Sequence, residues 1–322
     1  MDLRQLRYFV AIVDHASLSK AALRLHIAQP ALSQHVRHLE EELRVKLLVR
    51  GARGVTTTEA GARLHHHARA LLVQVDELPE LVREVEVNPV GEVRLGMSGT
   101  VSELVTVPLI EAARRWHPGV RIRPVEAMSG YVLDWLRRGE IDAAIVYGTT
   151  DPVGVTTHQV LTEELCLLGQ PGSAPAGARP DGVIPLASVL KLDLITPGGG
   201  HGLRDVIDSG AANLRAAMKP AFEIDSYSQI KALAAKGFGY GILPEMAVVR
   251  ETRERLLDVW HIVDPILQRK IFIAYRPDRP LSAATAAVAR LGYQVIRRLV
   301  RTGVWTARLP EGKDGASDTL NL

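Results

Sequence analysis

Residues 29–43 carry small and polar side chains between regularly spaced apolar ones. The apolar positions recur at helical spacing and predict one buried stripe, formed by Leu32, Val36, Leu39 and Leu43. The side chains expected to face outward include Ala31, Ser33, Gln34 and Arg37. Hydroxyl, amide and guanidinium groups can hydrogen-bond base edges, so this face fits the major groove of DNA. The alternative is an ordinary helical hairpin with a solvated polar face.

Two consecutive helices must position these side chains. The first begins after Ser17, a good N-cap because its hydroxyl can accept a hydrogen bond from an unpaired backbone N–H, and it reaches about Leu25. The second opens at Gln29, with Pro30 expected at the first helical position, where its missing N–H costs nothing. Together they predict a helix-turn-helix.

A short hairpin is expected directly after the second helix. Residues 47–50 are expected to form one strand, residues 51–54 a tight turn and residues 55–57 the return strand. Arg50 and Arg53 would then lie on a wing, placed for phosphates or the minor groove. Residues 1–58 hold nine Lys or Arg against five Asp or Glu, a balance of +4, whereas the whole chain is +3. Positive charge is therefore concentrated where DNA phosphates would be met.

The first sixty residues resemble the DNA-binding domain of LysR-type transcriptional regulators. The matching positions are Phe9, Ser17, Ala21, Ala22, Gln29, Pro30, Ala31, Ser33, Leu39, Glu40, Leu47, Arg50, Thr58 and Gly61. Two positions depart from the family pattern, Arg44 for a frequent glycine and Leu48 for a frequent phenylalanine. The resemblance implies double-stranded DNA as a partner. The expected DNA-binding residues are Ser17, Gln29, Pro30, Ala31, Ser33, Gln34, Arg37, Arg50 and Arg53.

A long helix is expected over residues 59–87, with Thr58 as its N-cap. Its apolar residues alternate spacings of four and three, the seam of a coiled coil: Leu64, Ala68, Leu71, Val75, Leu78, Val82 and Val85. We expect dimerisation through this helix, with Pro79 kinking it. The alternative is a single amphipathic helix packed on its own domain. The family resemblance further implies a homotetramer.

Length and composition indicate two or three domains and exclude several classes. The chain has 322 residues and no apolar run long enough for a membrane span. The N-terminus enters a helix directly, which predicts no secretory signal. Cys166 is the only cysteine, so no disulfide can form within the chain, and a reducing cytoplasm is the expected location. Its apolar surroundings favour a buried thiol over a redox sensor.

Residues 88–305 follow a βα pattern after the breaker cluster at 88–91. Alternating strands and helices predict an α/β fold, here with a parallel sheet covered on both faces. This order resembles the LysR effector domain, which has the fold of periplasmic solute-binding proteins. The resemblance implies one subdomain at about 91–162 and 268–304, and another at about 163–267. Residues 306–322 are expected to be a disordered tail.

Four turns at the carboxyl ends of predicted strands could hold a small ligand. Each precedes a helix, and converging helix N-termini favour a carboxylate, sulfate or phosphate. The expected effector-binding residues are Ser98, Gly99, Thr100, Ser129, Gly130, Thr196, His201 and Ser226. The alternative is that the hydroxyls only cap helices, and the two roles are compatible. The glycines at 198–200 lack the ending of a phosphate loop.

The combined prediction is a transcriptional regulator of the LysR type, and the group of nitrogen-assimilation regulators is the one it resembles within the family. Effector binding would shift the population of cleft conformations and so change operator binding. A solute-binding protein or an α/β enzyme is the alternative. The sequence offers no nucleophile elbow and no metal-ligand cluster, so neither catalysis, cofactor nor metal is expected.

Overall fold

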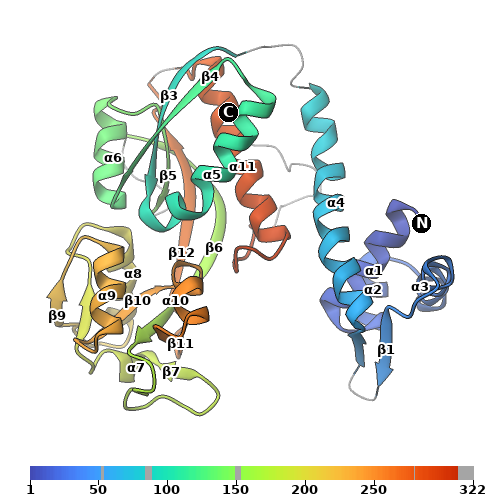
Figure 1. Ribbon diagram of the computed structural model, residues 1–322. Helices are drawn as coiled ribbons and strands as arrows, with labels where there is room; N and C mark the ends of the chain where they lie inside the picture. The colour runs from blue at the N-terminus through green and yellow to red at the C-terminus, as the bar shows by residue number, and fades with distance from the viewer. Residues whose placement is uncertain (52–53, 84–88, 149–153, 279, 311–322) are drawn as a thin grey trace. The chain divides into compact units, whose positions relative to one another are not determined.

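In the computed structural model, residues 1–51, 54–83, 89–148, 154–278 and 280–310 are described. The chain forms two compact units, residues 1–86 and 87–322. The described part of the first unit holds four helices and a two-stranded hairpin (Figure 1). They are α1 (Leu3–His15), α2 (Leu18–Leu25), α3 (Gln29–Leu43), β1 (Leu48–Gly51), β2 (Gly54–Thr57) and α4 (Glu59–Arg83). This is the predicted winged helix-turn-helix followed by a long helix.

Local signals in the sequence explain where these helices begin and end. Asp2 caps α1 through a capping box, and Ser17 caps α2 by accepting a hydrogen bond from the Lys20 N–H. α3 has no side-chain cap, and Pro30 occupies its second position rather than the predicted first. α3 ends at Arg44 in the left-handed conformation, with φ 53°. Glycine adopts this conformation at lower cost, which explains its frequency there in the LysR-type pattern.

The core of the first unit matches most of the predicted stripe. Leu32, Val36 and Leu39 are buried against α1, α2 and the hairpin, whereas Leu43 at the end of α3 is 38% exposed, contrary to the prediction. On the opposite side of α3, Gln34 and Arg37 are exposed.

The long helix α4 packs its first half against α1. The buried positions are Ala68 and Leu72, with Leu64 partly buried, and they contact Leu6. Leu71, predicted for the coiled-coil seam, is 43% exposed. The predicted seam is therefore not one continuous surface. Leu64, Ala68 and Leu72 pack on α1, whereas Leu71 lies outside this core. The helix continues through Pro79 as far as Arg83, and Val85 lies outside the described residues.

The second unit is built on one ten-stranded mixed sheet. Eight strands follow the order β4-β3-β5-β12-β6-β10-β8-β9; off this path β11 pairs with β6, and β7 pairs with β11. The strands of the first half are β3 (Gly91–Ser98), β4 (Val120–Ala127) and β5 (Ala143–Tyr147). Those of the second half are β7 (Val183–Pro185), β8 (Leu194–Thr196), β9 (Pro220–Glu223), β10 (Tyr240–Pro244) and β11 (Asp258–Val263).

Helices cover the sheet through two separate cores in the first half. β5 alternates its side chains, sending Ala143 and Ile145 toward α5 and α11 and sending Ala144 and Val146 toward α6. The helices of the unit are α5 (Gly99–Trp116), α6 (Ser129–Arg138), α7 (Leu186–Val189), α8 (Gly202–Asn213), α9 (Tyr227–Ala235), η2 (Glu245–Val248), α10 (Val249–Arg253) and α11 (Ala283–Arg301). Leucine, isoleucine and valine side chains of α8, α9, β8 and β10 form the core of the second half.

Two long strands pass between the halves, β6 (Thr156–Gly169) and β12 (Gln268–Tyr275) (Figure 1). β6 pairs antiparallel with β12 up to Glu164 and with β10 and β11 from Leu165 onward. The predicted parallel sheet is therefore wrong in this region, because β12 returns from the second half and inserts between β5 and β6. The crossing lies beside residues 163–165 and 267–269.

The segment after α11 is ordered as far as residue 310, contrary to the predicted tail from 306. Thr162 and Arg308 exchange two backbone hydrogen bonds, and Trp305 is buried in the core of the first half. Residues 311–322 lie outside the described residues. No helix in the described part of the chain combines the length and apolarity that a membrane span requires.

Candidate functional site

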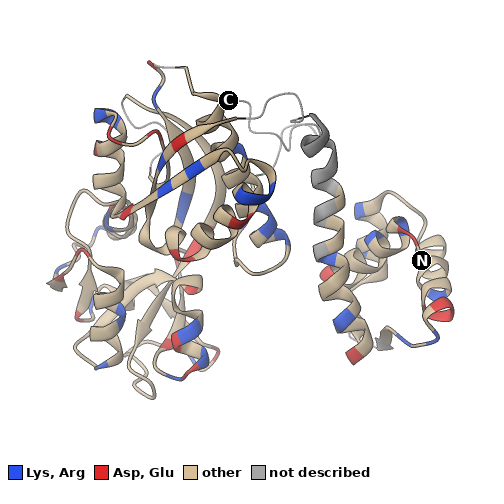
Figure 2. Cartoon of the chain, turned by 45° about the horizontal axis from the view of Figure 1, so that its top comes forward, with Lys and Arg blue, Asp and Glu red and all other residues tan. Residues whose placement is uncertain are grey.

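The outer face of α3 presents most of the predicted DNA-binding side chains. Gln29, Pro30, Ala31, Gln34 and Arg37 are exposed. Ser33 and Ser17 are half-buried, and Ser17 serves as the N-cap of α2. Ser19 donates a hydrogen bond to Gln29 Oε1 at 3.0 Å, which joins the starts of α2 and α3. Lys and Arg positions recur along α1 to α4 (Figure 2).

A surface hollow of about 570 Å³ lies between α3 and the start of the hairpin. It is lined by Pro30, Ser33, Gln34, Val36, Arg37, Glu40, Lys46 and Leu48. Arg37 is held only loosely, 3.7 Å from Glu41, with both side chains 64% exposed. The guanidinium can therefore leave this ion pair for a base or a phosphate at little cost.

Glu40 fastens the hairpin to α3. One carboxylate oxygen accepts hydrogen bonds from the backbone N–H of Leu47 at 2.9 Å and of Leu48 at 3.2 Å, and the other lies 2.7 Å from Lys46 Nζ. Partial burial raises the pKa of Glu40, but these hydrogen bonds outweigh it and leave the pKa below its usual value. The carboxylate is therefore charged at neutral pH and fixes the position of the wing.

The two wing arginines are described only in part. Arg50 pairs with Val55 in the β1–β2 ladder, and its side chain lies outside the described residues. Arg53 lies outside them entirely. Their expected contacts with DNA stay predictions.

Helix N-termini meet in the second unit around buried hydroxyls. Ser98 Oγ lies 3.0 Å from Ser129 Oγ, which brings the starts of α5 and α6 together, and both residues are buried. Ser98 is the N-cap of α5, yet its side chain makes no capping hydrogen bond. α6 and α8 also lack a side-chain cap. Side-chain capping therefore does not explain Ser98 and Ser129, and no capping side chain competes with a ligand at the starts of these three helices.

His201 approaches this region from the second half, which also holds the buried Thr196. Both are buried, and within the described chain neither Thr196 Oγ1 nor His201 Nδ1 has a hydrogen-bond partner. Gly130 allows the close approach of the halves, because a Cβ there would lie 2.6 Å from Gly200 O and 3.0 Å from His201 Nδ1. The His201 ring contacts that of Tyr131, with centroids 5.0 Å apart. Buried polar atoms without partners are costly, so they mark a place where a polar ligand can bind.

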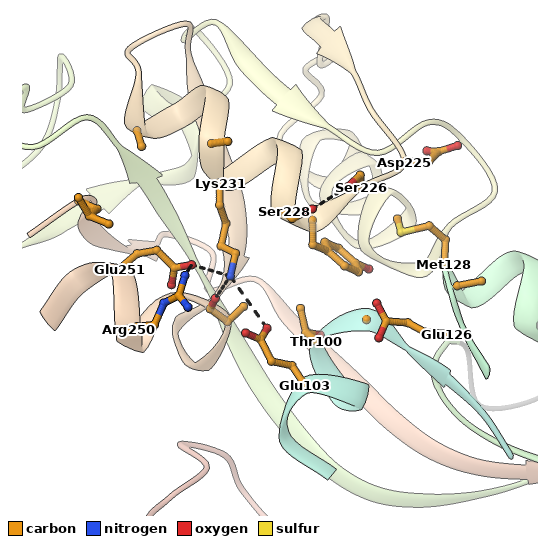
Figure 3. Close-up of a pocket in the computed structure, with 17 residues that line it drawn as sticks. Thr100, Glu103, Glu126, Met128, Asp225, Ser226, Ser228, Lys231, Arg250 and Glu251 are labelled. Carbon is orange, nitrogen blue, oxygen red and sulfur yellow. Dashed lines mark hydrogen bonds and ion pairs between the residues drawn. The ribbon is translucent and has the colours of Figure 1, made fainter. Parts of the chain in front are cut away.

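An open pocket of about 750 Å³ adjoins this region (Figure 3). Gly99, Thr100 and Ser226 line it, together with Tyr227 from the start of α9. Ser226 caps α9 by accepting a hydrogen bond from the Gln229 N–H, and its oxygen lies 3.0 Å from Ser228 Oγ. For Ser226, capping is thus observed and compatible with a ligand role.

The charges around the pocket are mixed and mainly negative. The charged lining residues are Glu103, Glu126, Asp225, Lys231, Arg250 and Glu251. Lys231 Nζ is occupied, since it lies 2.8 Å from Glu251 and donates to Ala247 O at 2.9 Å (Figure 3). Asp225 accepts a hydrogen bond from the Gly198 N–H and lies 3.5 Å from His201 Nε2. An anion is therefore favoured at the helix ends but not on the outer side of the pocket.

The structure brings seven of the eight predicted effector residues together in two groups. Ser98, Ser129, Gly130 and His201 lie beside one another. Thr196 is buried, and no described contact joins it to either group. Gly99, Thr100 and Ser226 line the open pocket.

Sequence reasoning missed a buried cluster behind the pocket. Arg269 Nε donates to Glu163 at 2.6 Å, and Arg269 Nη2 donates to Thr100 Oγ1 at 3.0 Å. The Arg269 guanidinium also stacks on Tyr147, 3.4 Å from the ring centroid. The sequence carried only a weak signal, an acidic pair in β6 and a basic pair in β12. The pairing of these two strands depends on a contact across more than a hundred residues.

Other residues that could carry chemistry have structural roles. Cys166 is buried and donates to Leu243 O, and burial raises the pKa of its thiol. His65 lies 2.7 Å from Asp14, whereas His66 and His67 contact each other edge to face. Among the described residues, no group of three or more His, Cys, Asp or Glu side chains could hold a metal ion.

Comparison with known protein families matches both units. The family "Bacterial regulatory helix-turn-helix protein, lysR family" matches residues 3–62, and "LysR substrate binding domain" matches residues 87–297. The nitrogen assimilation regulatory protein nac of Klebsiella aerogenes is 36% identical over 251 residues, covering 77% of this chain and 79% of that protein. The dual regulator OxyR of Escherichia coli K12 is 28% identical over 281 residues, covering 87% of this chain and 91% of OxyR.

Solved structures of full-length regulators share the fold. Full-length BenM has 25% identity and a TM-score of 0.55, covering 95% of this chain and 99% of BenM. A full-length variant of OxyR from Pseudomonas aeruginosa has 26% identity and a TM-score of 0.54, covering 92% of this chain and 99% of that one.

Proposed function

The chain belongs to the LysR family of DNA-binding transcriptional regulators with an effector-binding domain, and we propose that it recognises its operator through α3 and a small anionic group through the helix ends of its second unit. The exposed polar face of α3 carries the DNA part of this proposal. Gln34 and Arg37 contact base edges, while Arg50 and Arg53 contact phosphates and position the wing.

Fluorescence anisotropy with DNA from upstream of its own reading frame tests the DNA part. We expect a sequence-selective complex whose affinity falls with salt. Gln34→Ala or Arg37→Ala should relax preference at one base position and weaken binding by about 1–3 kcal/mol. Arg50→Ala and Arg53→Ala should weaken binding to all sequences and flatten the salt slope by about one unit each.

Lys219→Ala supplies the control, because Lys219 is an exposed cation of the second unit. It should leave the DNA complex unchanged. If all four substitutions in the first unit affected every DNA sequence alike, the division between base recognition and phosphate positioning would be wrong.

The effector part of the proposal is supported by the three uncapped helix starts and the unpartnered atoms of Thr196 and His201. An oxyanion there would accept backbone N–H hydrogen bonds and lie in the favourable field of the helix dipoles. Its binding would hold the halves of the unit together and shift the population of regulator conformations. Sulfate, phosphate and carboxylate titrations, followed by thermal unfolding of the full chain, test this part.

Self-association is the third part of the proposal. LysR regulators oligomerise, and the exposed Leu71 on α4 offers an apolar contact for a second copy through residues 59–87. Two copies of α3 would then read a roughly two-fold symmetric operator, and a homotetramer would join two such dimers.

A response to hydrogen peroxide through the thiol of a cysteine is a second candidate function, suggested by the similarity to a hydrogen peroxide-inducible genes activator of Escherichia coli. The chain has one cysteine, Cys166, and it is buried with a raised pKa. A disulfide within one chain needs two cysteines, and a reactive thiol needs a lowered pKa. We therefore favour an effector-binding regulator over a thiol-based sensor.

A further inference from the structure

A buried ion pair joins the two strands that cross between the halves of the second unit. Arg269 on β12 lies directly opposite Glu163 on β6 in the ladder, and each residue is 2% exposed. Burying two charges costs more desolvation than packing an apolar pair of similar volume. Such a pair is a weak source of stability, so its presence at the crossing suggests a role in recognition or switching.

The hydrogen bonds of this pair leave one donor unused. Arg269 uses Nε for Glu163 and Nη2 for Thr100, and the Arg269 plane stacks on Tyr147. Arg269 Nη1 makes no hydrogen bond to any described side chain or backbone group and is buried. Glu163 cannot turn toward it freely, because its other oxygen accepts a hydrogen bond from Trp305 Nε1 at 2.8 Å.

The Arg269 side chain lies next to two residues that line the open pocket. Thr100 and Tyr227 line the pocket, and Thr100 accepts a hydrogen bond from Arg269. Burial raises the pKa of Tyr227, although the charge of the neighbouring Arg269 and a contact of its guanidinium with the Tyr227 hydroxyl oppose this shift. The Tyr227 ring also packs on Gly99, where a Cβ would lie 3.0 Å from it. A ligand atom that passes between Thr100 and Tyr227 would reach the guanidinium.

We propose that Arg269 is a specificity-determining residue of the effector site, where its Nη1 and the N-terminus of α5 bind the carboxylate of a ligand that carries a single negative charge. This inference rests on the proposed function and narrows its ligand class. A guanidinium donor and helix N–H groups are both suited to a carboxylate. Because Arg269 is on β12, a ligand bound to it contacts one of the two strands that connect the halves of the second unit.

The surrounding charges restrict the rest of the ligand. Glu163 already balances the charge of Arg269, so the helix N-terminus supplies the remaining attraction for one negative charge, and a second negative charge would be disfavoured. Glu103, Glu126 and Asp225 line the open pocket beyond Thr100 (Figure 3). A second carboxylate there would meet like charges, whereas an ammonium group would meet opposite ones. The ligand class is therefore a monocarboxylate with a neutral or cationic far end, such as an amino acid.

A matched set of five-carbon ligands tests this assignment on the full chain. Pentanoate, 5-aminopentanoate, glutarate and pentylamine differ only in the charges at their ends. Thermal unfolding and isothermal titration should show binding of 5-aminopentanoate and, more weakly, pentanoate. Glutarate should bind at least about tenfold more weakly than 5-aminopentanoate, and pentylamine should not bind at the same concentrations.

Three variants separate the two ends of the ligand. Arg269→Lys keeps the charge but loses the fork of donors, and should weaken carboxylate binding about tenfold or more. Glu126→Gln lies on the exposed wall and should reduce the discrimination against glutarate. Glu111→Gln, on the exposed side of α5 away from the pocket, is the matched control and should change neither affinity.

Equal binding of glutarate and pentanoate by the wild-type chain would overturn the assignment, as would unchanged affinities in Arg269→Lys. Should Arg269→Lys fail to fold, the wild-type ligand series and Glu126→Gln still decide the matter. Absence of any ligand response also overturns it. The proposed regulatory function fails separately, only where the full chain shows no sequence-selective DNA complex.

Discussion

Glu40 links the helix that is placed to contact bases with the wing that follows it. Its carboxylate accepts two backbone hydrogen bonds from Leu47 and Leu48 and pairs with Lys46. Glu40→Gln keeps an acceptor oxygen but removes the charge, so we expect the free energy of unfolding of the first unit to fall by about 1–2 kcal/mol. Urea unfolding followed by circular dichroism measures this loss.

The same pair predicts a dependence on pH. The folded pKa of Glu40 lies below its ordinary value of 4.5. The stabilisation is therefore complete above about pH 4.5 and is lost as the pH falls through the folded pKa. The difference between wild type and Glu40→Gln should shrink in that acid range. Glu41→Gln, whose side chain is 64% exposed, is the control and should change stability by less than about 0.5 kcal/mol.

At the level of single residues, sequence patterns predicted what local chemistry determines. Ser17 and Ser226 cap helices as their types suggest, and the outward position of Gln34 follows from helical spacing. The Arg269–Glu163 pair could not be predicted, because the two residues are 106 positions apart and meet only through strand register. Helical or strand periodicity carries no information about such pairings.

At the scale of elements, α4 divides its apolar residues between two surfaces. Leu72 is 8% exposed against α1, and Leu71 is 43% exposed. Leu72→Ala should destabilise the first unit by about 2–3 kcal/mol, because it leaves a cavity in a packed interface. Leu71→Ala should leave that stability nearly unchanged but weaken self-association. Urea unfolding and sedimentation equilibrium measure the two effects separately.

Each of these two variants serves as the control for the other. Equal losses of unfolding free energy would mean that Leu71 belongs to the core of its own unit. An unchanged association constant in Leu71→Ala would indicate that the long helix does not form the dimer contact, and would favour the single packed helix.

The elements themselves were predicted with mixed success. Helical spacing predicted α3, and breaker residues predicted the start of the βα pattern near residue 88. The parallel sheet was wrong at β12, since strand direction depends on where the chain returns after crossing. Arg308 was wrongly assigned to a disordered tail, because the polar composition of residues 306–322 suggested disorder.

For the second unit as a whole, the two halves approach most closely where glycine allows it. Gly130, on α6 of the first half, faces Gly200 and His201 of the second half. Gly130→Ala favours the helix locally but places a Cβ 2.6 Å from Gly200 O, closer than such atoms can approach. We therefore expect the halves to separate slightly, which would weaken effector binding while each half keeps its own core.

The measurement is the change in operator affinity of the full chain with 5-aminopentanoate, recorded by anisotropy. Without ligand, Gly130→Ala should bind DNA as tightly as the wild type. With ligand, it should need about tenfold more 5-aminopentanoate to reach the same change in operator affinity. Gly148→Ala is the matched control, because no atom lies within 4 Å of a Cβ there. A clash between Gly130→Ala and Gly200 affects conformations in which the halves of the second unit touch, and does not affect conformations in which they are apart. A wild-type ligand response in Gly130→Ala would therefore mean that regulation does not depend on close contact between the halves.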